Sequence, residues 1–183
     1  MSRTLKLHPD SRCDAVTAIE VEAVRPAPGR LHLRYRVTGD SGGLVLPPAA
    51  EPARADGLWQ HTCFEVFLRT APNGAYVELN LAPSRLWAAY RFDGYREGQR
   101  PAEIAAPQIE VAAESDSYTL QADLVLDALP ELPAAAPWQL GLSAVIEEAG
   151  GRISYWALAH PPGKPDFHHS DCFALELAAA WRP

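Results

Sequence analysis

The sequence has little cysteine, no cluster of basic residues and no long hydrophobic run. Its three cysteines, Cys13, Cys63 and Cys172, are odd in number and far apart, so neither a disulfide framework nor a paired-thiol site is expected. The net charge is −7 without clustered Lys or Arg, which argues against nucleic acid and anionic membranes as partners. No apolar stretch approaches the roughly 20 residues of a membrane span.

Several familiar catalytic motifs are also missing. The chain has no nucleophile elbow, no P-loop and no GxGxxG segment. The string "GDSGG" at 39–43 resembles the active-site string of serine proteases, but a glycine-rich turn at the end of a strand explains it. The first residues contain no apolar segment of the kind found in signal peptides, so we expect a bacterial, cytoplasmic protein.

The composition is that of a folded globular chain. Of its 183 residues, 48% are hydrophobic and 21% are charged, which suits one domain over 1–183 with a sizeable core. The 17 prolines fall between the regular segments and therefore favour short strands over long helices.

Hydrophobic residues alternate with polar ones in many short segments. Residues 18–24 (AIEVEAV) and 31–37 (LHLRYRV) show this period of two and predict a hairpin with one solvated face. Further strands are expected at 62–69, 76–81, 86–92, 108–113, 118–126, 139–147, 153–157 and 173–177. One helical turn is expected within 127–137. This pattern predicts an all-β fold with little helix, an antiparallel β-sandwich.

The strand at 62–69 carries a glutamate among apolar residues. Alternation places Glu65 on the face opposite to Phe64, Val66 and Leu68. In the next strand Glu78 and Asn80 share a face, and if the two strands pair as a hairpin, Glu65 lies on the same surface. The register of the third strand, at 86–92, is not determined by its sequence. We assign Arg91 to the face of Glu65, because an arginine is costly in a core.

This polar floor has aromatic residues near it in the sequence. Trp59 and His61 directly precede the strand of Glu65, and Trp156 and His160 come from "ISYWALAH". Indole rings cover the C–H face of a sugar, and carboxylate, amide and guanidinium groups bind its hydroxyls. We therefore predict non-catalytic binding of a small polar ligand, a saccharide.

Two other interpretations of the same face stay open. It can be a solvated sheet surface with ion pairs between strands. Alternatively, Glu65 and Glu78 can form the carboxylate pair of a glycoside hydrolase, although nothing in the sequence fixes the distance between them.

Histidine and cysteine residues suggest a metal or haem site as a further alternative. No cofactor is the first expectation, because none of the spacings is that of a structural zinc site. The candidate ligands for a divalent metal are His61, Cys63, His168, His169 and Cys172. For haem, any two of His61, His160, His168 and His169 are candidates, since the only methionine is Met1.

Three long segments resemble a known superfamily. The strings "DGLWQHTCFEVFLR", "AYVELNLAPSRLWAAYRFDGYR" and "ISYWALAHPPGKPDFHHSDCFALEL" resemble the DOMON-like superfamily, in its bacterial branch similar to family-nine carbohydrate-binding modules. The resemblance covers most of the chain. It implies a jelly-roll-like or immunoglobulin-like β-sandwich.

The resemblance also implies roles for individual residues. In the sugar-binding relatives two tryptophans enclose a terminal sugar, while Glu, Arg and Asn bind its hydroxyls. Trp59 and Glu65 match this arrangement, Trp156 lies in the region of the second tryptophan, and Asn80 and Arg91 are looser matches. The calcium ligands of the relatives have no clear acidic match here, and the Met ligand of haem-binding relatives is absent.

Overall fold

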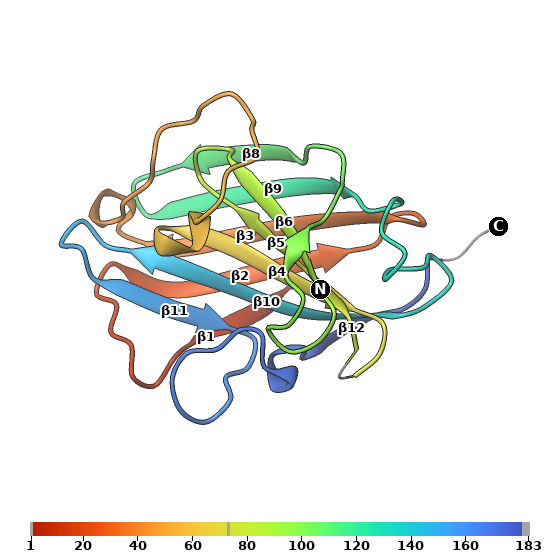
Figure 1. Cartoon of the computed structure of the whole chain (residues 1–183). Coiled ribbons are helices and arrows are strands. Elements are labelled where there is room, and N and C mark those ends of the chain that lie inside the picture. Colours follow the sequence, from red (N-terminus) through yellow and green to blue (C-terminus); the bar gives the residue numbers. More distant parts are fainter. Residues whose placement is uncertain (1, 73, 181–183) are drawn as a thin grey trace.

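The computed structural model describes residues 2–72 and 74–180, so positions 1, 73 and 181–183 of the expected domain lie outside the described residues. The chain is an antiparallel β-sandwich, which confirms the fold class (Figure 1). In the described part, the helical segments are three short 3₁₀ turns, η1 (Ser41–Gly43), η2 (Leu58–Gln60) and η3 (Ser170–Cys172). None of these is long and apolar enough to cross a membrane.

One layer, which we call the site sheet, carries the candidate functional face. Its strands run in the spatial order β7-β6-β5-β4-β10-β11, and β12 continues the row beside β10. Their bounds are β4 (Cys63–Arg69), β5 (Tyr76–Leu81), β6 (Trp87–Phe92), β7 (Arg100–Pro101), β10 (Trp138–Glu147), β11 (Ile153–Ala157) and β12 (Leu175–Leu177).

The other layer, the back sheet, has the spatial order β2-β3-β9-β8. Its strands are β2 (Val16–Val24), β3 (Arg30–Gly39), β8 (Gln108–Ala113) and β9 (Ser117–Val125). The first strand, β1 (Arg3–Leu7), belongs to both layers. Its beginning pairs with β2 and its end pairs with β11, where Lys6 faces Ala157. The two layers are therefore joined at one edge by hydrogen-bonded backbone.

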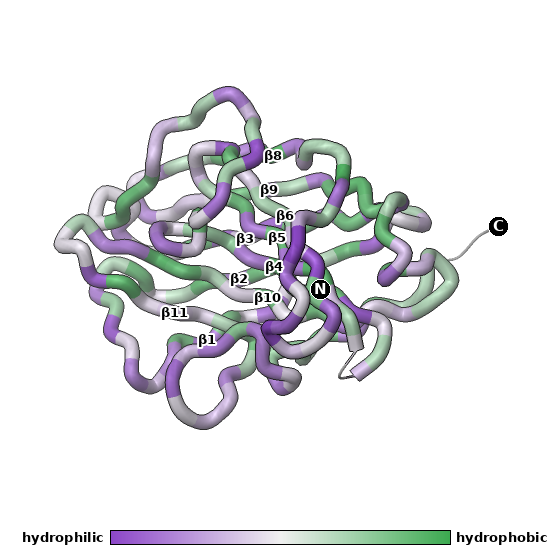
Figure 2. Tube along the Cα trace, viewed as in Figure 1, coloured by the Kyte–Doolittle hydropathy of each residue, from purple (hydrophilic) through white to green (hydrophobic). Residues whose placement is uncertain are grey.

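The core lies between the layers and follows from the alternation in the sequence. In β2 and β3 buried and exposed residues alternate, and the tube in Figure 2 changes between hydrophobic and hydrophilic colours along them. Phe64, Val66 and Leu68 of β4 are fully buried. They point into the sandwich, where they form one core with the inward-facing residues of the back sheet. Both faces of β4 are buried, however, because loops cover its outer face as well.

The structure differs from the sequence-based expectation in several places, among them the short strand β7 (Arg100–Pro101), which was not predicted. The strand β1 was not predicted, because five residues with three charged or polar side chains carry little alternation signal. The helical turn expected within 127–137 is instead a run of hydrogen-bonded turns, in which the Leu129 amide donates to the Leu126 carbonyl and the Leu132 amide to that of Leu129. The closely spaced prolines of this segment prevent a longer helix.

Candidate functional site

The outer face of the site sheet has a row of small side chains around Glu65. Reading across the strands, Ala157 of β11, Ser143 of β10, Glu65 of β4, Asn80 of β5 and Ala88 of β6 are direct neighbours. The two alanines pack beneath larger aromatic side chains of the same face and of the loops. Of this row, Glu65 is the residue that lines the cavity above the sheet.

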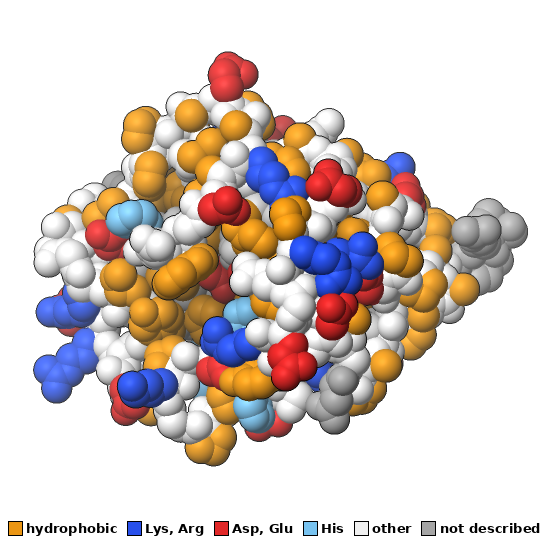
Figure 3. All heavy atoms as spheres, viewed as in Figure 1, with side chains coloured by type: hydrophobic (Ala, Val, Ile, Leu, Met, Phe, Trp, Pro, Cys, Tyr) orange, Lys and Arg blue, Asp and Glu red, His pale blue; other side chains and the backbone are white. Residues whose placement is uncertain are grey.

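Loops and strands together enclose a cavity of about 570 Å³ on this face. Seen from the side of Figure 1, the surface is hollowed there, with hydrophobic side chains in the hollow and charged ones around it (Figure 3). Aromatic residues and a few polar groups make up most of its lining. The lining residues are Trp59, Glu65, Phe67, Glu78, Tyr90, Phe92, Arg96, Gln99, Val145, Tyr155, Lys164, Pro165, Phe167 and His168.

Glu65 is buried at 3% exposure and has few polar partners. The Ser143 hydroxyl donates to its Oε2 at 3.4 Å. Burial, together with repulsion from Glu78, raises the pKa of Glu65 well above its usual value, although the Ser143 hydrogen bond opposes the rise. The carboxyl group can therefore form a hydrogen bond or an ion pair with a molecule in the cavity.

Glu78 lies on the neighbouring strand, one pleat away from Glu65. It is exposed by 6%, and the Asn80 side-chain amide donates to its Oε1 at 2.7 Å. His168 Nε2 lies 3.7 Å from its Oε2. Burial raises the pKa of Glu78, while the Asn80 hydrogen bond and the positive charge of Arg96 act in the opposite direction.

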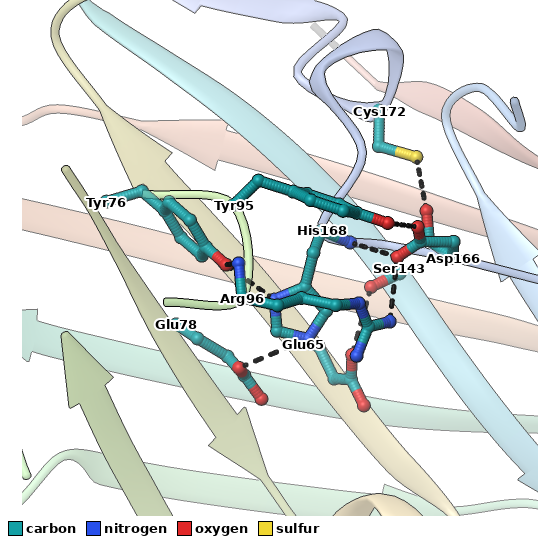
Figure 4. Close-up of polar contacts among 9 residues, drawn as sticks. All are labelled: Glu65, Tyr76, Glu78, Tyr95, Arg96, Ser143, Asp166, His168 and Cys172. Atoms are coloured by element: carbon teal, nitrogen blue, oxygen red, sulfur yellow. Dashed lines mark hydrogen bonds and ion pairs between the residues drawn. The ribbon is translucent and has the colours of Figure 1, made fainter. Parts of the chain in front are cut away.

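A polar network holds the loop residues that close the cavity (Figure 4). His168 Nδ1 lies 2.8 Å from the Tyr76 hydroxyl, and the His168 amide donates to Asp166 at 3.2 Å. Asp166 also pairs with Arg96 at 2.8 Å and accepts from the hydroxyl of Tyr95. Burial and the charge of Arg96 lower the pKa of His168 to about 4, so its ring is neutral near pH 7.

Arg96 reaches the cavity from an unusual backbone conformation. Its φ is 56°, in the left-handed region that non-glycine residues rarely adopt. Its backbone amide donates to the Tyr76 hydroxyl at 3.2 Å, and its guanidinium is fixed by Asp166. Such strain persists only where surrounding contacts enforce it, and here those contacts place Arg96 at the cavity wall.

The raised pKa values predict how stability depends on pH. A glutamate whose pKa is raised in the folded chain binds protons more tightly there than in the unfolded chain. The free energy of unfolding therefore falls as the pH rises from about 4.5 through the raised pKa. We expect the Glu65→Gln variant, which removes one of these groups, to gain stability relative to the wild type as the pH increases.

Urea unfolding of both proteins at a series of pH values from about 5 to about 8 measures this difference. The exposed Glu110 on the back sheet provides the control, because Glu110→Gln removes the same charge without removing a buried group. Parallel stability curves for Glu65→Gln and the wild type would contradict the assignment of a raised pKa to Glu65.

Of the residues predicted for the ligand site, three line the cavity and two of the others point elsewhere. Trp59, Glu65 and Glu78 are in the lining. Trp156 instead belongs to the core between the layers, at 5% exposure, where its indole N–H donates to Ser154 at 3.0 Å. Its placement as a second aromatic wall is corrected, because alternation along β11 turns the neighbouring Tyr155 to the cavity.

The placement of Arg91 is also corrected by the register. Arg91 faces Val77 of β5, a residue of the sandwich interior, while Tyr90 faces Glu78. The cost of a buried arginine is avoided because Arg91 is at the end of its strand, partly exposed, and forms an ion pair with Glu131. The aromatic pair Tyr90 and Phe92 therefore takes the place beside the glutamates.

The remaining predicted residues do not line the cavity. Asn80 is fully buried and acts on the cavity through its hydrogen bond to Glu78. His61 is exposed, with Nδ1 2.7 Å from Glu147. His160 Nε2 lies 2.7 Å from the backbone oxygen of Lys6.

Sequence reasoning did not place several lining residues in the site. These are the residues of the loops after β6 and β11 and the outward aromatics of β6 and β11: Tyr90, Phe92, Arg96, Gln99, Tyr155, Lys164 and Phe167. For Lys164 and Phe167, the segment "PPGKPDF" gave one indication, because its proline-rich composition with an aromatic end is typical of an ordered loop. The loop from 93 to 99 gave no comparable signal.

The candidate metal ligands are not gathered into one group. In the ranges 2–72 and 74–180, no cluster of three or more His, Cys, Asp or Glu side chains is arranged to hold a metal ion. Burial raises the pKa of Cys172 to about 12 and that of Cys63 well above its usual value, which disfavours the thiolate that binds metals. His169 Nδ1 accepts from the Asp171 amide at 3.2 Å. Of the four histidines considered for haem, His168 alone is in the cavity lining.

Comparison with solved structures finds carbohydrate-binding proteins of the same fold. A proposed carbohydrate-binding protein from Bacteroides uniformis superposes with a TM-score of 0.65 at 12% identity, over 93% of this chain and 82% of the other. A family-nine carbohydrate-binding module from Caldicellulosiruptor kristjanssonii in complex with glucose gives 0.55 at 13% identity, over 98% and 86%. A module of the same family and organism in complex with cellotriose gives 0.52 at 14%, over 87% and 74%.

The likeness is one of fold, because the identities are low. The sequence matches no protein-family model and is not significantly similar to a curated protein sequence. Membership of the DOMON-like superfamily therefore stays a prediction. The chain has the β-sandwich fold that is also found in these carbohydrate-binding proteins, family-nine modules among them.

Proposed function

We propose that the chain is a non-catalytic saccharide-binding domain whose ligand occupies the cavity above β4 and β5. The observation that carries this proposal is the meeting of two buried carboxylates with several aromatic side chains in one space of about 570 Å³. Ligand sites of small molecules have volumes of about 300–1,000 Å³ and combine apolar walls with a few polar groups. Solved structures of the same fold hold glucose and cellotriose, which supports a sugar as the ligand class.

Each part of the cavity has a role in this proposal. Trp59, which is 54% exposed, would cover the apolar face of the sugar ring at the entrance. Glu65 and Glu78 would accept hydrogen bonds from hydroxyl groups at the base, where little water competes. Gln99 and Lys164 would donate to ring or hydroxyl oxygens from the loops.

Replacing Trp59 with alanine tests the proposal on a ligand-facing residue that the core does not need. We expect the affinity for the bound sugar to fall roughly tenfold, because one stacking surface is lost, and the free energy of unfolding to stay nearly unchanged. Trp59→Phe keeps an aromatic face and should recover much of the affinity. Isothermal titration with sugars selected on a glycan array, glucose and cellotriose included, measures the loss.

The same experiment separates binding from hydrolysis. Glu65 and Glu78 share the cavity, which the hydrolase alternative also requires, so release of chromophore from chromogenic glycosides is followed in parallel. Turnover by the wild type that Glu78→Gln abolishes would contradict a non-catalytic function. Silence of the wild type across the array, or equal affinity of wild type and Trp59→Ala, would contradict saccharide binding at this cavity.

A further inference from the structure

The base of the cavity holds two carboxyl groups that no cationic side chain of the described residues contacts. Within the described residues, no Lys or Arg nitrogen lies within 4.0 Å of the carboxylate of Glu65 or Glu78. The nearest basic group is His168, 3.7 Å from Glu78, and its lowered pKa, about 4, keeps it uncharged near pH 7. The two carboxyl groups therefore repel each other when both are ionised, and no cationic side chain in the described part of the chain lies between them.

Two cationic residues do occur in the lining, but neither forms an ion pair with the glutamates. Arg96 is paired with Asp166, and its charge lowers the pKa of Glu78 less than burial raises it. Lys164 is exposed on the loop.

The uncharged groups around the carboxylates do not supply a counter-charge either. Burial raises the pKa of Tyr76 to about 12, and those of Tyr90 and Cys63 are also raised, so all three are neutral near pH 7. The Tyr90 hydroxyl is already engaged, because it donates to Asp56.

The carboxylates also have acceptor capacity to spare. In residues 2–72 and 74–180, Oε1 of Glu65 receives no hydrogen bond, and Oε2 receives one long one from Ser143. Figure 4 shows the carboxylate groups of Glu65 and Glu78 on the same side of the sheet, with His168 and Arg96 beside them. A carboxylate that is more than nine-tenths buried and faces open space with a free oxygen is suited to a donor from a ligand.

We propose, on the basis of the saccharide-binding function, that the cavity selects an amino sugar and holds its ammonium group between Glu65 and Glu78. An ammonium group has three donors for the free acceptor positions and a positive charge, which no Lys or Arg of the described residues places within 4.0 Å of the two carboxylates. The rings of Tyr90, Phe92 and Phe167 in the same lining add favourable cation–π contacts. A neutral sugar of the same shape brings no charge that would offset the repulsion between the glutamates when both are ionised.

Titration calorimetry on the full chain at pH 7 tests this proposal with matched ligands. The probes are glucosamine, galactosamine and mannosamine, their parent hexoses, and their N-acetyl forms, which keep the substituent and lose the charge. We expect at least one hexosamine to bind tenfold or more tightly than its parent hexose, and its N-acetyl form to bind no more tightly than the parent.

Variants identify the carboxylates as the cause. Glu78→Gln keeps the shape of the side chain and should reduce the preference for the amine to less than threefold, whereas the exposed Glu110→Gln should leave it unchanged. If Glu78→Gln does not fold, as judged by circular dichroism, Glu65→Gln is used in the same way. Equal affinity for amino and parent sugars would overturn the ammonium site and leave saccharide binding intact. Binding of no sugar, charged or neutral, in this panel and on the glycan array would overturn both.

Discussion

The Glu65→Ala variant is expected to lose 10- to 100-fold in affinity for its sugar while keeping its fold. A hydrogen bond to a charged group contributes about 1.5–3 kcal/mol, and about 1.4 kcal/mol corresponds to a factor of ten in affinity. The Glu65 carboxylate has one long hydrogen bond within the protein, so its removal breaks few internal contacts. It also removes a charge that Glu78 repels.

Calorimetry against the tightest sugar found for the wild type, together with thermal unfolding, measures this expectation. Glu110→Ala serves as the matched control, because it removes a carboxylate from the exposed face of the back sheet. An unchanged dissociation constant in Glu65→Ala would rule out the base of the cavity as the ligand site. Loss of the folded state in that variant would show instead that the carboxylate is needed for the fold, against its sparse internal bonding.

The second large effect is expected at Trp156 and concerns stability. Replacing this tryptophan with alanine should lower the free energy of unfolding by about 3–5 kcal/mol, because a large buried side chain leaves a cavity in the core. Such a loss is a large part of the roughly 5–15 kcal/mol that stabilises a typical domain. Denaturant unfolding followed by intrinsic fluorescence and circular dichroism measures it.

Trp59→Ala is the paired comparison for Trp156→Ala. Both remove an indole ring, but one ring is half exposed at the cavity and the other is nearly inaccessible between the sheets. We expect Trp59→Ala to change affinity and not stability, and Trp156→Ala to change stability by several kcal/mol. Similar stabilities for the two variants would contradict the assignment of Trp156 to the core.

The strands could be predicted well from the sequence, because the alternation of hydrophobic and polar residues is a local signal. Alternation in 18–24 and 31–37 appears in the structure as β2 and β3, and the assignment of Glu65 to the face of Glu78 and Asn80 follows from the same period of two. Register between strands is not local, and there the prediction for Arg91 was wrong. Arg91 avoids the cost of burial because it lies near the end of its strand and forms an ion pair with Glu131. This partner is 40 residues away, so the sequence around Arg91 gives no sign of it.

The cavity walls could be predicted less well than its floor. Trp156 and Tyr155 are adjacent aromatic residues, and composition does not say which one faces the core; the pairing of β11 with β10 decides it. Arg96 lies at the cavity because of a left-handed backbone and a hydrogen bond from its amide to Tyr76, which are features of a folded loop. Loop residues of this kind require the three-dimensional arrangement of their neighbours.

The shared strand β1 has a consequence for biosynthesis. A ribosome releases Lys6 early, but its partner Ala157 emerges roughly 150 residues later. The edge that joins the two layers can therefore form only after β11 has been synthesised. The backbone hydrogen bonds between β1 and β11 are therefore a late step in folding, and they connect two segments that are far apart along the chain.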